Sequence, residues 1–309
     1  MTTAGALQIE LKTQARAPGG RVVLAGSGPL LLAVAAQMAR LGNPPVAIIE
    51  NGAPFGRVRL GLGLPLSYLR EAAGYMATLL RARVPILTRS DVREIRAEGG
   101  ALEVIVDGPA GSRRILADRV GLHDGLRPND IGVTGCAALP VLTLGDCAEV
   151  LGARAALASG RAGGIALAQA LRDGGAPAPI GSKTLSRERE AQRRLAAIYA
   201  HDGMDRLAGL PGDTVLCRCE GRTLADLRDL GDAPRPRELR LLGRIGMGPC
   251  QGRFCGEWVA RATAADPAAP PASPPGAARW PLAPVAIADL LSAAPDRDAA
   301  PDPSEGQPT

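Results

Sequence analysis

The stretch that decides the fold runs from Arg21 to Glu50 and reads RVVLAGSGPLLLAVAAQMARLGNPPVAIIE. Its first apolar run, Val22–Ala25, predicts a buried strand. A tight glycine turn separates this strand from small apolar residues over 29–41, which predict a helix, and a second apolar strand then ends at Glu50. A strand, a glycine turn, a helix and a second strand in this order form a βαβ unit, so we expect a parallel sheet.

The glycine turn itself, Gly26-Ser27-Gly28-Pro29, lies where a dinucleotide-binding fingerprint requires it, after a strand and before a helix. Gly26 allows the turn, and Gly28 lets the backbone approach a pyrophosphate at the helix N-terminus, where free N–H groups favour anions. The fingerprint has Gly or Ala at its third position, but Leu31 stands there in this chain. Two interpretations therefore stay open: a nucleotide site, and a Rossmann-like scaffold whose site is empty.

Glu50 decides which nucleotide such a site would favour. It lies about 20 residues after Gly28, at the end of the second strand, where a carboxylate accepts a hydrogen bond from a ribose 2′-hydroxyl and repels a 2′-phosphate. We therefore expect NAD or another plain adenine nucleotide rather than NADP.

The chain beyond the βαβ unit continues the alternation of helices and strands. Apolar residues at helical spacing predict a helix over 66–83, and a short strand follows over 84–87. Two strands over 102–107 and 114–120 are separated by turn residues, which predicts a hairpin laid over the sheet.

A later apolar run, Pro140–Leu144, predicts a further strand that Gly145 and Asp146 stop. The segment Ala153–Leu171 is a helix so rich in Ala and Gly that another segment must pack closely against it. A charged amphipathic helix over 187–199 then leads into the last part of the chain.

Composition excludes several classes of protein. There are 36 basic and 31 acidic residues, and aromatic residues make up only 2% of the chain. Nucleic-acid binding is not expected, because it requires clustered basic residues interleaved with stacking aromatics. No apolar run approaches the length of about 18 residues that a membrane span requires. The start lacks the basic head and apolar run of a secretory signal, so we expect a cytoplasmic location.

Four of the six cysteines lie in one segment, at Cys217, Cys219, Cys250 and Cys255. Their spacing is C-x-C followed by C-x4-C, whereas a zinc ribbon more often has C-x2-C pairs at a shorter separation. A [2Fe-2S] cluster requires four thiolates that converge on two irons. We favour the cluster, with zinc and unligated thiols as the alternatives.

The surroundings of the second cysteine pair also favour a cluster. Glycines in the stretch 246–256 leave backbone N–H groups free to point at sulfur, which tunes the potential of such a centre. Four arginines could offset the negative charge of a cluster: Arg218, Arg222, Arg244 and Arg253. The remaining cysteines, Cys136 and Cys147, lie outside the pattern and are expected to be small buried hydrophobes.

Three motifs together resemble a known family. CRCE (217–220) and GMGPCQGRFCG (246–256) resemble the ferredoxin-type domain, related to bacterioferritin-associated ferredoxin, that is fused to flavoproteins of the octopine/nopaline oxidase and hydroxyproline dehydrogenase alpha-subunit family. That family is also similar to a hydrogen cyanide synthase subunit. VVLAGSGPLLLAVAAQ (22–37) is similar to its second dinucleotide-binding domain, and LTLGDCAEVLGARAALASGRAGG (142–164) to its late FAD-contacting segment. The resemblance extends to about residue 291.

This resemblance implies an α/β fold, with an N-terminally incomplete, Rossmann-like two-dinucleotide-binding flavoprotein core and a small helical ferredoxin-type domain with four cysteines. The expected domains are a remnant of a flavin-binding region (1–20), an NAD-type dinucleotide-binding domain (21–125), the late FAD-contacting segment with its helices (126–200), the [2Fe-2S] domain (211–263), and an Ala/Pro-rich linker with a docking segment and a tail (264–309).

The resemblance also implies a role for Gly145 and Asp146 at FAD, where the carboxylate reaches the ribityl or pyrophosphate region. Capping of the next helix is the alternative role for Asp146. In the family a full G-x-G-x-x-G that binds the FAD adenosine precedes the second fingerprint, and we find no counterpart of it ahead of Gly26. FAD binding by this chain is therefore left open.

Functionally, the resemblance implies an electron-transfer subunit of a heteromeric amino or imino acid dehydrogenase (oxidase) complex, whose partner is an FAD-containing, amino-acid-oxidase-like beta subunit. The alternatives are a non-catalytic assembly module that docks through RWPLAPVAIADLL (279–291), and an NADH-dependent reductase. We identify no catalytic residue in this chain, because His123 and His201 stand alone and no triad or carboxylate pair is recognisable.

Overall fold

The computed structural model describes residues 1–126, 128, 141–201, 210–231, 234–262 and 285–288. The chain divides into two compact units. The first comprises residues 1–130 and 135–202, and the second comprises residues 131–134 and 203–309. The prediction for Cys136 and most of the expected linker and docking segment lie outside the described residues.

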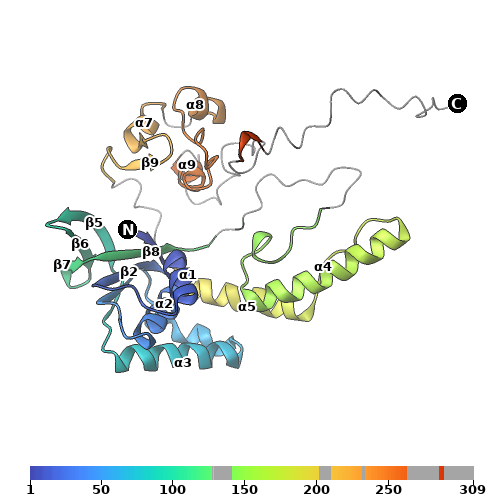
Figure 1. The fold of residues 1–309 in the computed structure, drawn as a ribbon, viewed down its shortest axis with the longest axis horizontal. Coiled ribbons are helices and arrows are strands. Elements are labelled where there is room, and N and C mark those ends of the chain that lie inside the picture. Colours follow the sequence, from blue (N-terminus) through green and yellow to red (C-terminus); the bar gives the residue numbers. More distant parts are fainter. Residues whose placement is uncertain (127, 129–140, 202–209, 232–233, 263–284, 289–309) are drawn as a thin grey trace. The chain divides into compact units, whose positions relative to one another are not determined.

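The first unit is built on a five-stranded sheet in which every pair of neighbouring strands is parallel (Figure 1). The strand order is β1-β8-β2-β3-β4, with bounds Thr2–Thr3, Arg119–Asp124, Val22–Ser27, Ala47–Glu50 and Ile86–Thr88. Helix α2 (Pro29–Arg40) connects β2 to β3, so the predicted βαβ unit is confirmed. A mixed α/β fold of the Rossmann type is therefore present.

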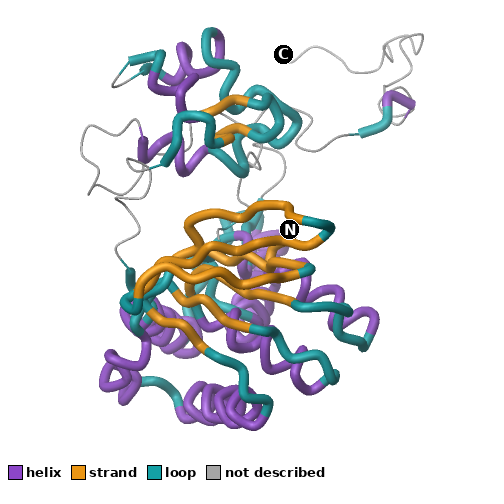
Figure 2. Tube along the Cα trace, turned by 90° about the vertical axis from the view of Figure 1, so that its left-hand side faces the viewer, coloured by secondary structure: helices purple, strands orange, loops and turns teal. Residues whose placement is uncertain are grey.

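The two faces of this sheet are covered differently, as Figure 2 shows. Helices α1 (Ala4–Gln14), α2 and α3 (Leu66–Arg81) pack on one face, and a three-stranded antiparallel sheet covers the other. Its strands are β5 (Asp91–Glu98), β6 (Ala101–Gly108) and β7 (Gly111–Ala117). Strand β2 serves both layers, because its side chains alternate between them. Val22 and Leu24 lie in the helical core, whereas Val23 and Ala25 lie in the core beneath β5–β7.

The first twenty residues belong to this unit in the structure. Leu7 and Leu11 of α1 are 1% exposed and pack with α2, and β1 pairs with β8. Each buried leucine contributes about 1.5–3 kcal/mol through removal of its apolar surface from water. The proposal that residues 1–20 are the remnant of a flavin-binding region stays a prediction, but here they complete the helical core.

Two long helices, α4 (Ala153–Asp173) and α5 (Lys183–Ile198), follow within the same unit. Helix α5 packs against the 3-10 helix η1 (Pro54–Gly63), and one hydrogen bond also joins it to α3. The Tyr68 hydroxyl of α3 donates to Glu188 Oε2 of α5 at 2.5 Å, and the Arg154 guanidinium of α4 lies 5.1 Å from the Tyr68 ring centroid. Burial and this hydrogen bond raise the pKa of Tyr68 to about 12, so the phenol stays protonated and keeps donating.

Two predictions about strands need correction. Residues Val141–Leu144 form no strand, because they pair with none of the described strands; Leu144 instead packs against Gly163 of α4, where an added Cβ would lie 2.6 Å from Leu144 Cδ1. The expected close packing on the Ala/Gly-rich helix is thereby confirmed. The strand predicted over 114–120 is split at Asp118, so that β7 completes the hairpin with β6 and β8 joins the parallel sheet.

The second unit is small and has its own core. Its elements are β9 (Val215–Cys217), β10 (Arg222–Thr223), α7 (Leu224–Arg228), α8 (Pro236–Leu241) and α9 (Gly256–Ala262). Thr223 and Asp226 form a reciprocal capping box that begins α7, a contact typically worth about 1 kcal/mol. The core is formed by Leu224, Leu227, Leu239, Ile245 and Val259 together with two of the cysteines. Among the described helices of the chain, none combines the length and apolarity that crossing a bilayer requires.

Candidate functional site

The glycine turn has the predicted context, with β2 before it and α2 after it. Gly26 and Gly28 have φ angles of 131° and 115°, which only glycine adopts without strain, and Pro29 opens α2. The close approach at Gly26 has a specific cause in this fold: an added Cβ would overlap the backbone carbonyl of His123 on β8. The first glycine of the fingerprint is therefore required by strand packing, whether or not a nucleotide binds.

Glu50 lies at the end of β3, as predicted, but its carboxylate is turned inward. It is 3% exposed and accepts hydrogen bonds from Gly28 N–H at 3.1 Å and Gly52 N–H at 2.9 Å. Burial raises its pKa, which the two backbone donors and the Ser27 hydroxyl partly counteract. Both oxygens that would meet ribose hydroxyls are thus engaged by the protein's own backbone.

One residue near this turn was missed at the sequence level. The Ser27 hydroxyl donates to the backbone carbonyl of Tyr199 at 3.1 Å, across 172 residues of sequence. Nothing local in the sequence points to this contact, because it depends on how α5 packs against η1. As the chain is folded here, the residues around the turn do not fit an adenine nucleotide, so NAD binding stays a prediction.

The predicted flavin-contacting residues, Gly145 and Asp146, form part of η2 (Gly145–Cys147). Asp146 Oδ1 accepts from the N–H groups of Leu151 and Gly152, at 3.1 and 3.0 Å, just ahead of α4. Both amides lie ahead of the first turn of α4, which has no side-chain cap, so Asp146 fixes the loop that enters α4 and does not cap the helix itself. A role at FAD stays a prediction.

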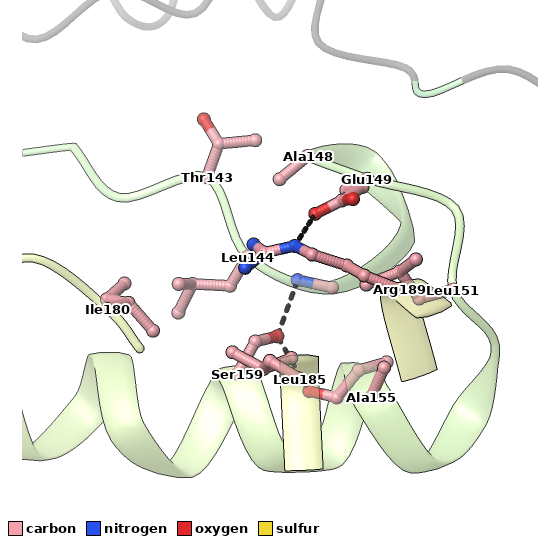
Figure 3. A pocket seen from close by; sticks show the side chains of 12 residues that line it. Thr143, Leu144, Ala148, Glu149, Leu151, Ala155, Ser159, Ile180, Leu185 and Arg189 are labelled. Atoms are coloured by element: carbon pink, nitrogen blue, oxygen red, sulfur yellow. Dashed lines mark hydrogen bonds and ion pairs between the residues drawn. The ribbon is translucent and has the colours of Figure 1, made fainter. Parts of the chain in front are cut away.

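A cavity of about 200 Å³ lies beside this segment, between η2, α4 and α5 (Figure 3). Leu144, Ile180 and Leu185 are among the side chains that line it, and Gly145 N–H donates to Ser159 Oγ at 2.9 Å. At its edge the Arg189 guanidinium and the Glu149 carboxylate form an ion pair at 2.7 Å. Most of the side chains that the figure labels around this cavity are apolar, so its walls offer mainly apolar contact.

The four predicted cysteines come together in the second unit. Cys217 ends β9 and Cys255 precedes α9, and both are buried in the apolar core. Cys219 is exposed on the turn between β9 and β10, and Cys250 is half-buried in the loop before α9. The two sequence motifs therefore meet in space, in a group that extends from the core to the surface. The sequence-level expectation for Cys147 is wrong, because this thiol is exposed.

The thiols interact in two pairs. A hydrogen bond to the Cys250 thiol raises the pKa of Cys219, and burial, together with the charge and hydrogen bond of Cys217, raises the pKa of Cys255 to about 12. Weaker electrostatic interactions join Cys217 to Cys219 and Cys250 to Cys255. Each pair unites one cysteine of the first motif with one of the second.

The loop around Cys250 directs backbone N–H groups at sulfur. Burial opposes ionisation of Cys250, but hydrogen bonds from the N–H groups of Phe254, Gly252 and Arg253 and from the Cys219 thiol lower its pKa. Gln251 and Gly252 have φ angles of 52° and 80°, and the Arg253 N–H also donates to the Cys250 backbone carbonyl at 3.1 Å. Donors aimed at a sulfur stabilise a thiolate and tune a bound metal centre.

Gly248 allows the two motifs to meet. An added Cβ at this position would overlap Cβ of Cys219 and would lie 3.3 Å from Glu220 Oε1. The glycine is thus a steric requirement for the approach of the second motif to the first.

Two of the predicted compensating arginines are already paired. Arg244 Nη2 lies 2.8 Å from Glu220 Oε2, and Arg222 Nη1 lies 3.6 Å from Asp226 Oδ1. Their positive charges are therefore offset within ion pairs, and Arg218 is left as an exposed cation beside the first motif.

The donor set can be tested against the metals that the spacing allowed. Among the described residues, no three or more His, Cys, Asp or Glu side chains already surround a point where one metal ion could bind. A tetrahedral zinc ion requires all its sulfur ligands at about 2.3 Å from such a point. A [2Fe-2S] cluster instead takes two thiolates on each of two irons. The choice between a cluster and zinc at these four cysteines therefore stays a prediction.

The parallel sheet entered through a glycine turn defines a protein of the Rossmann dinucleotide-binding fold class, here followed by a small four-cysteine unit. No family model matches the chain. The A subunit of opine oxidase from Agrobacterium tumefaciens is 33% identical over 93% of this chain and 64% of that protein. The corresponding opine oxidase protein of Rhizobium meliloti strain 1021 is 30% identical over 86% of this chain and 65% of that protein.

Hydrogen cyanide synthase subunit HcnB of Pseudomonas aeruginosa is 28% identical over 84% of this chain and 65% of that protein. The chain is therefore similar to opine oxidase A subunits over most of its own length, and it spans just under two thirds of the length of these relatives. Among solved structures, thioredoxin reductase of T. acidophilum is 17% identical with a TM-score of 0.33, over 63% of this chain and 56% of that one. A likeness at this TM-score carries no argument about function.

Proposed function

We propose that this chain is an electron-transfer subunit of a heteromeric amino or imino acid dehydrogenase (oxidase) complex, and that Cys217, Cys219, Cys250 and Cys255 hold a [2Fe-2S] cluster. The observation that carries the proposal is the meeting of the two cysteine motifs, where Gly248 of the second motif packs directly against Cys219 of the first and the four thiols interact. Names of the relatives as subunits of oxidoreductases support the class of activity.

The four cysteines would hold such a centre from different depths in the second unit. Cys217 and Cys255 anchor it in the apolar core, where exclusion of water strengthens electrostatic interactions. Cys219, on the exposed turn, brings the other end to the surface. When bound, a cluster of this type accepts and donates electrons singly at a potential set by hydrogen bonds to its sulfurs. The exposed end is the side from which we expect electrons to be exchanged.

The family resemblance implies that a partner subunit carries out the chemistry. We propose an FAD-containing, amino-acid-oxidase-like beta subunit, which would oxidise the substrate's C–N bond by hydride transfer. The relatives are named as single subunits of an oxidase and of a synthase, which supports a multi-subunit complex. The cytoplasm is the proposed location.

The test is anaerobic purification of the chain followed by analysis of iron, acid-labile sulfide and zinc. We expect about two irons and two sulfides per chain and visible absorption that dithionite bleaches. Each of the substitutions Cys217→Ser, Cys219→Ser, Cys250→Ser and Cys255→Ser should remove most of the iron. Cys147→Ser is the matched control, because this exposed cysteine lies outside the motifs, and it should keep full iron content.

Three results would contradict the proposal. One is stoichiometric zinc without iron, one is loss of iron in the Cys147→Ser control to the same extent as in the motif variants, and one is a chain that takes up no metal when supplied with iron and sulfide.

A further inference from the structure

The dinucleotide turn is covered by a segment of the same chain, the α5 end, which we define as residues 198–201. This segment follows the last turn of α5 and precedes the second unit in sequence. It lies within the first unit, so its contacts with the turn are internal to one compact body.

Tyr199 makes the contacts at the centre of the turn. Its backbone carbonyl accepts from the Ser27 hydroxyl at 3.1 Å and lies against Gly52, where an added Cβ would be 2.9 Å from that oxygen. Burial and the nearby negative charge of Glu50 raise the pKa of Tyr199 well above its usual range. The phenol therefore lies near the carboxylate that a fingerprint of this kind reserves for ribose.

Arg57 of η1 holds the α5 end in place. Its Nη1 donates to the backbone carbonyl of Ala197 at 3.4 Å and to that of Ala200. The last carbonyls of a helix have no partner within the helix and carry partial negative charge, so a guanidinium there is stabilising. The contact explains why the chain continues across the turn instead of leaving it at the end of α5.

Apolar and polar contacts on either side complete the attachment. Ile198 is 8% exposed, and its Cδ1 would lie 3.9 Å from a Cβ added at Gly61 of η1. His201 Nε2 lies 4.0 Å from Asp124 Oδ1 at the end of β8. The segment thus reaches the carboxyl ends of β2, β3 and β8, which form the edge where ligands bind in open parallel sheets.

We propose that the α5 end is an intramolecular occupant of the dinucleotide site, so that an adenine nucleotide binds only when residues 198–201 leave it. A nucleotide in the fingerprint position requires space over the turn and access to the Glu50 carboxylate, but the Tyr199 carbonyl lies on Ser27 and Gly52 and the carboxylate is 3% exposed. If the closed form predominates by a given factor, the apparent affinity for nucleotide falls by the same factor. The proposal is independent of the cluster in the second unit.

The test compares nucleotide binding by the full chain and by variants that loosen the α5 end. Isothermal titration with ADP and with NADH is applied to the wild type, Arg57→Ala and Arg59→Ala. Arg59 lies on the same 3-10 helix and makes no hydrogen bond or ion pair with any described residue, which makes it the matched control. We expect Arg57→Ala to bind about tenfold more tightly than the wild type, and Arg59→Ala to bind like the wild type.

A second variant keeps the proposal testable even if Arg57→Ala does not fold. Ser27→Ala removes the hydrogen bond to the Tyr199 carbonyl, together with the interaction of this hydroxyl with Glu50, and should tighten binding about threefold. In the wild type, saturating ADP should also speed amide hydrogen exchange over 198–201. Equal affinity of wild type, Arg57→Ala and Ser27→Ala would overturn the proposal, and so would the absence of measurable binding in all of them.

Discussion

The glycine turn and the cysteine loops are both short motifs that place backbone N–H groups around a point, but the chain treats the two points in opposite ways. At the turn, the N–H groups of Gly28 and Gly52 are used by the protein's own Glu50. In the loop around Cys250, backbone N–H groups lower the pKa of a cysteine thiol, and cysteine thiolates are common metal ligands. The donors of the glycine turn are used within the protein, whereas those of the cysteine loop surround the proposed metal site.

This difference shows why a motif alone does not define a site. Both motifs fix local geometry, because positive φ angles and steric exclusion of a Cβ require glycine at given positions. Whether the resulting donors remain available depends on the groups packed around them. At the turn Glu50 accepts from both amides, and Tyr199, 172 residues from Ser27, accepts from the Ser27 hydroxyl and covers the turn.

The largest effect is expected on the free energy of unfolding, for substitutions in the glycine turn. In Gly26→Ala the new methyl group would overlap the His123 carbonyl, and we expect a loss of about 3 kcal/mol in the free energy of unfolding. In Gly28→Ala the new Cβ would lie 3.6 Å from the His123 ring, so only backbone strain of about 1 kcal/mol is expected. Urea unfolding followed by circular dichroism measures both values.

If the two glycines served a nucleotide alone, neither substitution would alter the stability of the nucleotide-free chain. An equal or larger loss in Gly28→Ala than in Gly26→Ala would show that the packing of β2 against β8 is not the reason for the first glycine.

The next largest effect concerns the cysteine loops. Gly248→Ala should separate the two motifs, because its Cβ would overlap that of Cys219, and iron content should fall below about half of the wild-type value through overpacking of about 1–3 kcal/mol. Gly212→Ala is the control in the same unit, since its Cβ would meet the Ala225 Cβ at an ordinary 3.4 Å. Iron and sulfide analysis of both variants provides the measurement. Full iron in Gly248→Ala would mean that the two motifs need not approach this closely.

The sequence predicted the first unit well where the signal is local. The βαβ unit, the hairpin and the four helices α2 to α5 follow from apolar periodicity and glycine punctuation. It failed at Val141–Leu144, which has strand-like composition but no described partner strand, because pairing is a property of the whole sheet. The spacing of the cysteines predicted that they act together, and the structure adds which thiols form pairs. Neither the enclosed state of Glu50 nor the part of Tyr199 could be predicted, because both arise from tertiary packing.

The smallest effect is expected on the ionisation of the three tyrosines of the chain, one of which, Tyr199, lies at the glycine turn. The pKa values of Tyr68 and Tyr75 are raised to about 12, first by burial and then by their hydrogen bonds to Glu188 and Glu71, and burial raises that of Tyr199 as well. A raised folded-state pKa means that the stabilisation is complete below the unfolded value of about 10 and is lost as pH rises towards 12. Near pH 10 the native chain should therefore show little tyrosinate absorbance, whereas the urea-unfolded chain should be about half ionised.

The variant Arg57→Ala then distinguishes the titration of Tyr199 from that of Tyr68 and Tyr75. Releasing the α5 end exposes the Tyr199 phenol and removes it from the Glu50 charge, so one of the three tyrosines should titrate closer to the unfolded value. The same shift should be absent in Arg57→Ala combined with Tyr199→Phe, because Tyr68 is bonded to Glu188 in the middle of α5 and Tyr75 to Glu71 of its own helix, outside the α5 end. A wild-type chain in which Tyr199 already titrates like an unfolded tyrosine would mean that the turn is open, and the contrast between the two motifs would then disappear.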